Sequence, residues 1–172
     1  MIRVIITILI IGFCKIDAKA LNYKQINILK QVKEIAKNYP NKHGKTLEKI
    51  AMAICLSETG AGKSRFGDKH LLQKGIKEAS YGVMQVRLQT AKFVAKVYKL
   101  KDIVFLSDIS LIKKMMNDDK FNIKLAILYL VWLSNNSKDH FETISRYNGG
   151  KVNHSYYNKV KRNLQLIKKY NL

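Results

Sequence analysis

The stretch TLEKIAMAICLSE, residues 46–58, decides the fold. Its apolar residues follow the i, i+3, i+4, i+7, i+8 spacing of one face of an α-helix: Leu47, Ile50, Ala51, Ile54 and Cys55. The next position in this series, i+11, is Glu58. The pattern therefore predicts a buried helix over about 46–58 that carries a carboxyl group on its apolar face.

Glu58 has a chemical consequence in this position. Burial disfavours the charged form of a carboxyl group, so we expect the pKa of Glu58 to be raised. A carboxylic acid that is still protonated near neutral pH can donate its proton to a leaving oxygen, as a general acid does in glycosidic cleavage. The alternative is a side chain at the helix end that turns outward to solvent, and helical phase alone does not decide between the two.

The remaining chain is also mainly helical in pattern, over about 23–38, 88–98, 107–116, 122–135, 139–147 and 156–170. Residues 122–135 are apolar almost all round, and we expect them to form the central buried helix. Strand signals are weak, and residues 85–87 are expected to lead into the helix at 88. The sequence thus predicts an all-α, mainly helical single domain, allowing for a very small β-hairpin in the stretch 60–82 near Glu58.

Residues 1–20 differ from the rest of the chain. Arg3 is followed by a nearly uninterrupted apolar run over 4–13, and Ala18-Lys19-Ala20 has the small-x-small pattern of a signal-peptidase site. The run is shorter than the roughly 20 residues of a membrane-spanning helix. We therefore expect a cleaved signal peptide over 1–20, a mature domain over 21–172, and export to the periplasm. An uncleaved membrane anchor is the alternative, and it would also export the domain.

The chain is strongly basic, with 32 Lys and Arg against 12 Asp and Glu and a formal net charge of +20. Residues 1–20 account for +2, which leaves +18 on the mature domain. Such a charge favours anionic partners, and for an exported domain the cell wall and membrane take precedence over nucleic acid, which we do not expect as a partner. Part of the charge is equally explained as solvated surface.

The cysteines and histidines predict neither a disulfide nor a metal site. Removal of residues 1–20 leaves Cys55 as the single cysteine, which we interpret as a small buried hydrophobe among apolar neighbours. The four histidines, at 43, 70, 140 and 154, have no metal-ligand spacing. We expect no metal and no other cofactor.

Five short blocks, in order over about 46–160, resemble the soluble lytic transglycosylase family. They are AICLSET at 53–59, like the family's active-site helix; SYGVMQV at 80–86, continued by QTA at 89–91, like its Gly-Leu-Met-Gln and Thr-Ala blocks; NIKLAILYL at 122–130; RYNGG at 146–150, like Ala-Tyr-Asn-x-Gly; and YNKV at 157–160. Each block is weak alone, but their number and order are specific.

This resemblance implies a lysozyme-like fold and an activity. The activity is cleavage of the β-1,4 bond between N-acetylmuramic acid and N-acetylglucosamine in peptidoglycan glycan strands, without net addition of water. Glu58 would act first as general acid and then as base, and the product would end in 1,6-anhydro-muramic acid.

The resemblance also implies substrate-binding residues around Glu58: Ser80, Gly82, Met84, Gln85, Tyr147 and Asn148. Met84 and Gln85 would line the sugar groove, and Gly82 would let the chain approach closely. Tyr147 would lie against the carboxyl group or stack on a sugar, with core packing as its alternative. Ser80 would bind substrate or only turn the chain, and Asn148 would hold the loop.

Departures from the family pattern leave some features open. The 59–79 segment is longer than usual, Arg146 stands where the family has a small residue, and no proline precedes the QTA block. A lysozyme-type hydrolase would pair Glu58 with a second carboxylate, for which Asp68 is the nearest candidate, although Asp68 also fits a solvated loop acid. A non-catalytic cationic wall-binding protein is a third hypothesis. We expect a monomer, and a secretion, conjugation or motility apparatus is one setting in which it would act.

Overall fold

The structure is a computed structural model that describes residues 20–65, 73, 75–150 and 152–172. Residues 1–19 of the expected signal peptide, and Asp68, lie outside the described residues. Helices dominate: α1 (Tyr23–Lys37), α2 (Glu48–Thr59), α4 (Leu88–Val97), α5 (Lys101–Val104), α6 (Asp108–Asn117), α7 (Asp119–Asn135), α8 (His140–Tyr147) and α9 (His154–Lys169). Two short strands, β1 (Ser80–Tyr81) and β2 (Val86–Arg87), form an antiparallel hairpin.

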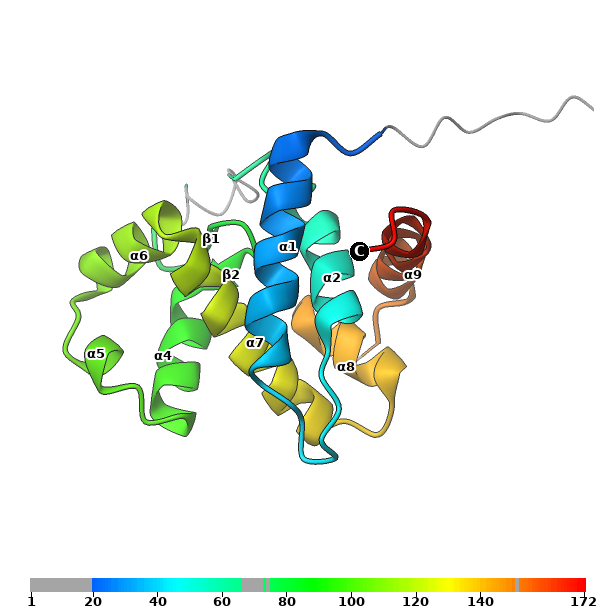
Figure 1. The fold of residues 1–172 in the computed structure, drawn as a ribbon. Coiled ribbons are helices and arrows are strands. Elements are labelled where there is room, and N and C mark those ends of the chain that lie inside the picture. Colours follow the sequence, from blue (N-terminus) through cyan, green and yellow to red (C-terminus); the bar gives the residue numbers. More distant parts are fainter. Residues whose placement is uncertain (1–19, 66–72, 74, 151) are drawn as a thin grey trace, which may run out of the picture.

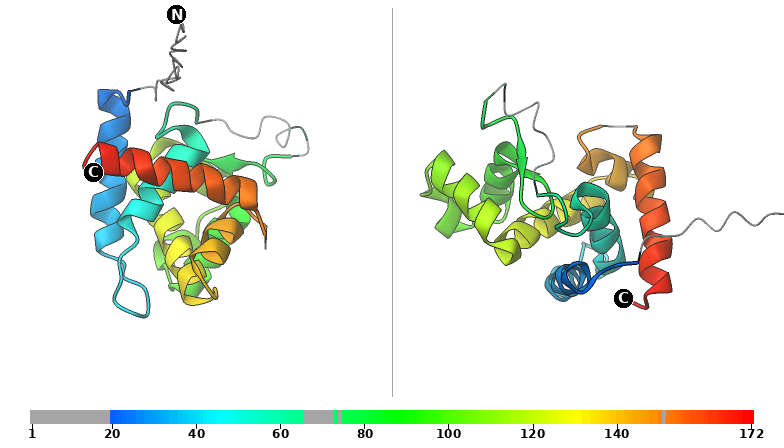
Figure 2. Two further views of the ribbon diagram at one scale, coloured as in Figure 1. Left: turned by 90° about the vertical axis from the view of Figure 1, so that its right-hand side faces the viewer. Right: turned by 90° about the horizontal axis from the view of Figure 1, so that it is seen from above.

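Helix α7 lies in the middle of the fold (Figure 1). Helices α4, α5 and α6 lie on one side of it, and α1, α2, α8 and α9 lie on the other, as the view from above also shows (Figure 2). Residues from Ile123 to Val131 of α7 are buried except Lys124 and Tyr129, because the helix has neighbours on nearly all sides. No helix among the described residues is both long and apolar enough to cross a membrane.

Helix α2 is buried on more than one face. All residues from Ala51 to Ser57 are buried, since the helix packs between α1 and α9. Gly60 then adopts a left-handed conformation with φ 62°, and its N–H donates to the carbonyl of Leu56. A left-handed glycine ends a helix at little steric cost. The catalytic candidate Glu58 therefore lies in the last turn of a fixed, buried helix.

Side-chain caps set the starts of several helices. Oxygen atoms of the capping side chains accept hydrogen bonds from backbone N–H groups three residues on, at Asn22, Ser107, Asp118, Asp139 and Asn153. Each bond satisfies a donor that has no partner within its own helix. These caps explain why α7 begins at Asp119 and α9 at His154, earlier than their apolar patterns suggest.

The hairpin is fastened to α7 by the fully buried side chain of Asn122. Its Nδ2 donates to the carbonyl of Tyr81 at 2.8 Å, and its Oδ1 accepts from the N–H of Met84 at 2.9 Å. Gly82 lies directly against this amide, with φ 75°. The turn between the strands thus depends on the buried side chain of Asn122, which follows Met84 by 38 residues in the sequence.

The all-α class is confirmed, and so is the presence of a very small hairpin. Two details differ from the prediction. The hairpin occupies 80–87, so its first strand lies inside the expected stretch 60–82 and its second strand lies beyond it. Residues 86–87 form that second strand, and Arg87 is also the N-cap of α4, so they lead directly into the helix as expected. The short helix α5 was not predicted.

We expect Gly82→Ala to destabilise the fold far more than Gly44→Ala. Both glycines have positive φ, 75° and 72°, so each substitution incurs the left-handed penalty of about 1 kcal/mol. A Cβ at Gly44 meets nothing within 4 Å, whereas at Gly82 it would lie 2.5 Å from the carbonyl oxygen of Met115 and against Asn122. Overpacking should therefore raise the total loss for Gly82→Ala to about 3 kcal/mol. Chemical denaturation of both variants measures it, and equal losses would contradict this account.

Candidate active site

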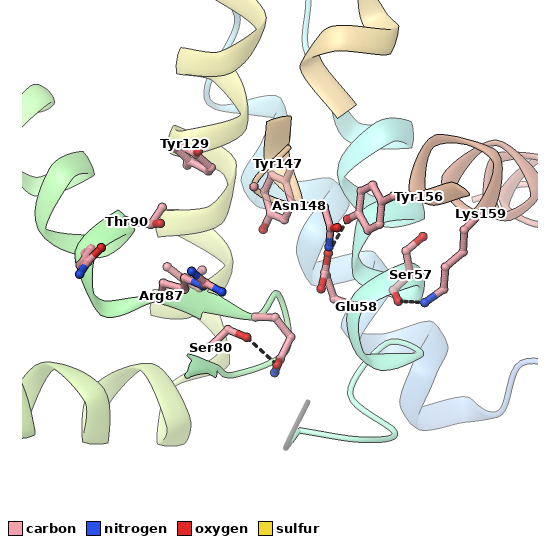
Figure 3. Close-up of a pocket in the computed structure, with 14 residues that line it drawn as sticks. Ser57, Glu58, Ser80, Arg87, Thr90, Tyr129, Tyr147, Asn148, Tyr156 and Lys159 are labelled. Atoms are coloured by element: carbon pink, nitrogen blue, oxygen red, sulfur yellow. Dashed lines mark hydrogen bonds between the residues drawn. The ribbon is translucent and has the colours of Figure 1, made fainter. Parts of the chain in front are cut away.

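A cleft of about 550 Å³ opens between the hairpin and α4 on one side and α2 and α9 on the other (Figure 3). Its lining comes from segments far apart in the sequence: Ser57, Glu58, Ser80, Gln85, Val86, Arg87, Gln89, Thr90, Tyr129, Tyr147, Asn148, Gly149, Tyr156 and Lys159. Glu58 is the only acidic side chain among these described lining residues. The cleft is therefore polar, with one carboxyl group and two basic side chains.

Glu58 is partly buried and faces the cleft from the last turn of α2. The hydroxyl of Tyr156, at the start of α9, donates a hydrogen bond to its Oε1 (Figure 3). Burial, and the negative charge of Glu58 beside it, raise the pKa of the Tyr156 phenol. The phenol therefore stays protonated and remains a donor, which orients the carboxyl group and stabilises its ionised form.

Helix α9 also holds the end of α2 through Ser57. The ammonium of Lys159 donates to the carbonyl of Ser57, and the Asn163 amide donates to Ser57 Oγ at 2.8 Å. Ser57 Oγ in turn donates to the carbonyl of Ala53 at 2.8 Å. Carbonyls in the last turn of a helix have no intrahelical partner, and a cation there is favoured by the helix dipole. These contacts fix the backbone immediately before Glu58.

Tyr147 lies against the hairpin. Its hydroxyl donates to the carbonyl of Met84 at 3.0 Å, and its ring centroid is 5.8 Å from that of Tyr129. Burial and the nearby negative charge of Glu58 raise the pKa of the Tyr147 phenol well above its ordinary value. Its hydroxyl is thus committed to the backbone, while its ring lines the cleft between Tyr129 and Glu58.

Met84 and Gly82 lie behind the cleft and not in its lining. The Met84 side chain is 0 % exposed and belongs to the core. Gly82 is buried against Asn122. Both residues shape the turn from inside, and Met84 reaches the cleft only through its carbonyl and the Tyr147 hydroxyl. The sequence expectation that the Met84 side chain lines the groove therefore does not match its position.

Ser80 and Gln85 line the cleft and are tied to each other. Ser80 Oγ donates to Gln85 Oε1 at 3.0 Å, and Gln85 Nε2 donates to the carbonyl of Gly82 at 2.9 Å. Gln85 has φ 50°, a conformation that is costly for a residue with a Cβ. The bonds from its side chain hold it in that conformation, so its amide is presented to the cleft in a fixed position.

Asn148 follows α8 and lines the cleft with an exposed side chain. Its Oδ1 accepts from the Asn153 amide at 2.9 Å, which links the two ends of the connection to α9. Of the six residues expected to bind substrate, the cleft thus brings four together with Glu58: Ser80, Gln85, Tyr147 and Asn148.

The sequence analysis missed several lining residues, above all Tyr156. The family-like block begins at Tyr157, one residue after the tyrosine that contacts Glu58. Helical spacing carried the signal, because Tyr156, Val160 and Ile167 follow i, i+4, i+11 and are all buried. Arg87 and Lys159 were missed as well, since nothing in the local pattern shows that two exposed basic residues face the same cleft.

Cys55 lies beneath the cleft and is fully buried, as expected. Its thiol contacts the carbonyl of Val83 at 3.7 Å, and burial together with the charge of Glu58 raises its pKa. The thiol is therefore protonated and poorly nucleophilic. Within the described ranges, no group of three or more His, Cys, Asp or Glu side chains is arranged to hold a metal ion.

We expect Tyr156→Phe to flatten the loss of stability at alkaline pH. The pKa of Tyr156 is raised in the folded protein above the ordinary value of 10.0. Its neutral form therefore supports folding fully below pH 10, and this support is lost as pH rises further, at about 1.4 kcal/mol per pH unit. Between pH 9 and 11 the total loss in the free energy of unfolding should therefore be smaller by about 1.4 kcal/mol in the variant, as denaturation curves across this range measure.

The control is Tyr23→Phe, which removes a phenol that is 77 % exposed. It should leave the alkaline slope of the free energy of unfolding as it is in the parent protein. An unchanged slope in Tyr156→Phe would contradict the burial of its phenol beside Glu58.

Comparison with known proteins agrees with this geometry. The family model of the Transglycosylase SLT domain matches residues 36–170, which include every lining residue of the cleft. Searches of curated proteins and of solved structures give no significant match. Since the family match covers most of the chain, the protein belongs to the transglycosylase SLT domain family, the lytic transglycosylases of the lysozyme-like superfamily.

Proposed function

We propose that this protein is an exported peptidoglycan lytic transglycosylase in which Glu58 performs the chemistry. Its SLT domain supports lytic cleavage of peptidoglycan in general terms. The observation that carries the finer proposal is the position of Glu58, which faces a polar cleft and accepts a hydrogen bond from the Tyr156 hydroxyl. The bond cleaved is the β-1,4 linkage between N-acetylmuramic acid and N-acetylglucosamine.

The first step is protonation of the leaving oxygen. A protonated Glu58 donates its proton to the glycosidic oxygen as the bond from that oxygen to C1 of N-acetylmuramic acid breaks. Positive charge develops at C1 and the ring oxygen, and Glu58 becomes a carboxylate. The neutral Tyr156 hydroxyl stabilises this carboxylate by its hydrogen bond, at the moment when the negative charge appears.

The second step uses the same carboxylate as a base. Glu58 accepts the proton of the C6 hydroxyl while the C6 oxygen forms a bond to C1 of the same sugar. The product is a 1,6-anhydro-muramic end, Glu58 is again protonated, and no water is consumed. A single carboxyl group is sufficient for this sequence, which agrees with the presence of one acid among the described lining residues.

The other lining side chains support substrate binding in this proposal. The Gln85 amide donates to the carbonyls of Gly82 and Arg65, so its oxygen is the atom that can accept a hydrogen bond from a sugar hydroxyl or acetamido N–H group. The Ser80 hydroxyl, which donates to that oxygen, holds it in place. The rings of Tyr129 and Tyr147 offer apolar faces for sugar C–H groups. Asn148 closes this side of the cleft. The proposed reaction uses no metal, other cofactor or nucleic acid. We propose that the protein acts as a monomer, either in general remodelling of the cell wall or beside a secretion, conjugation or motility apparatus.

We expect Glu58→Gln to lower the rate of glycan release from purified sacculi by about 1,000-fold or more, because one group serves as both acid and base. The parent protein should release fragments that end in 1,6-anhydro-muramic acid, identified by mass. Glu78→Gln, which also removes one acidic charge but on the exposed surface, should retain the activity. Full activity in Glu58→Gln would exclude the proposed role.

The products separate the alternatives. Hydrated reducing ends, one water heavier than anhydro ends, would favour a lysozyme-type hydrolase, and loss of activity in Asp68→Asn would strengthen that conclusion. Binding to sacculi without release of fragments, and weaker binding at higher salt, would favour a non-catalytic cationic wall-binding protein.

For export, we expect the full chain, expressed in a Gram-negative host, to be recovered from the periplasm with Leu21 as its first residue. The small residues Ala18 and Ala20 precede Leu21, and a bulky residue in place of either alanine blocks cleavage. Ala18→Phe should therefore be exported but remain uncleaved. A full-length parent chain in the membrane fraction would instead indicate an uncleaved anchor.

A further inference from the structure

Among the described residues that line the cleft, two are basic, and they have different surroundings. Lys159 is bound to the carbonyl of Ser57 and holds the end of α2. Arg87 forms no ion pair and no side-chain hydrogen bond with any described residue. Its five N–H donors are therefore available to a bound molecule.

The direction of Arg87 follows from the short strand β2. Successive side chains of a strand point to opposite faces, and Val86 is buried while Arg87 is exposed. In the hairpin register Arg87 pairs with Ser80, which also lines the cleft. Figure 3 shows Arg87 on the hairpin side and Glu58 with Tyr156 on the α2 and α9 side. The backbone of Arg87 is fixed by strand pairing, and only its side chain is free to adjust.

We propose that Arg87 binds a carboxylate of the substrate and makes the cleft selective for glycan that carries one. A guanidinium group is planar and matches a carboxylate with two parallel hydrogen bonds. Among the described lining residues the only acid is Glu58, on the opposite side of the cleft, so no other carboxyl group of that lining can take this place.

This inference rests on the proposed function for its substrate, and peptidoglycan offers such carboxylates in two places. The lactyl group of N-acetylmuramic acid is a free carboxylate when the stem peptide is removed. When the peptide is present, the lactyl group is an amide and the carboxylates belong to the peptide. Both sources present a carboxylate to the guanidinium group. Neutral glycans that consist of N-acetylglucosamine alone carry no carboxylate.

The test uses calorimetry to measure the dissociation constants of three muramic-acid-containing tetrasaccharides. The protein is the full domain carrying Glu58→Gln, a substitution that prevents turnover. The first has free lactyl carboxylates, the second carries stem peptides, and the third has its lactyl carboxylates capped as methylamides. Two further proteins combine Glu58→Gln with a substitution of Arg87. Arg87→Met keeps the approximate side-chain length without the charge, and Arg87→Lys keeps the charge without the planar guanidinium group. Lys96→Met, on the exposed surface of α4 and outside the cleft lining, is the control for net charge.

With Arg87 present, we expect a carboxylate-bearing tetrasaccharide to bind at least about tenfold more tightly than the capped one. Preference for the first identifies the lactyl group as the ligand, and preference for the second identifies the stem peptide. Arg87→Met should abolish the preference without changing the affinity for the capped tetrasaccharide. Arg87→Lys should keep part of it, and Lys96→Met should keep it all.

Equal affinity for all three tetrasaccharides, a preference that survives Arg87→Met, or no binding of any of them would overturn the inference. Arg87→Met that weakens all three equally would also overturn it, since that result reports a general loss of the site. Failure of the proposed function is seen separately, as the absence of glycan release from sacculi by the parent protein with Glu58 intact.

Discussion

The buried amide of Asn122 is the interaction on which the cleft depends. It satisfies one carbonyl and one N–H of the hairpin turn, at Tyr81 and Met84, and both groups are otherwise enclosed by apolar side chains. A buried backbone group without a partner costs about 1–3 kcal/mol. The amide therefore selects one position for the turn, and Gly82 is required because no Cβ fits beside it. This contact therefore also fixes the positions of the polar side chains that face the cleft from the hairpin.

Much of the helical fold follows from sequence because long helices leave a periodic record. The pattern over 46–58 predicts α2 to within two residues at each end, and the apolar run at 122–135 predicts the central position of α7. The second strand of the hairpin was not predicted, because strands of two residues are too short for an alternating pattern. Its turn also uses Gln85 at φ 50°, which is not a residue type that marks such a conformation. Helix α5, with four residues, is too short to be periodic.

The site was predictable where local chemistry is unusual and unpredictable where it depends on tertiary contacts. Glu58 stands out because an acid interrupts an apolar face. Tyr156 does not stand out, because a buried tyrosine is common and its partner lies 98 residues earlier in the chain. Met84 was expected in the groove, yet its side chain fills the core, since only tertiary packing decides which face of a turn a residue occupies. For the same reason sequence did not predict that Arg87 and Lys159 face one cleft.

The contacts between α9 and the end of α2 also determine when the site is formed during synthesis. The groups on α9 that hold Ser57 and Glu58 follow them by 98 to 106 residues. A nascent chain that has emerged only as far as α8 has the glutamate but lacks the residues that orient it. Because the chain emerges N-terminus first, from the ribosome and in export alike, the cleft is completed last, after nearly the whole domain has emerged. In the proposed mechanism, the carboxyl group of Glu58 is therefore not oriented for catalysis until the final helix has docked.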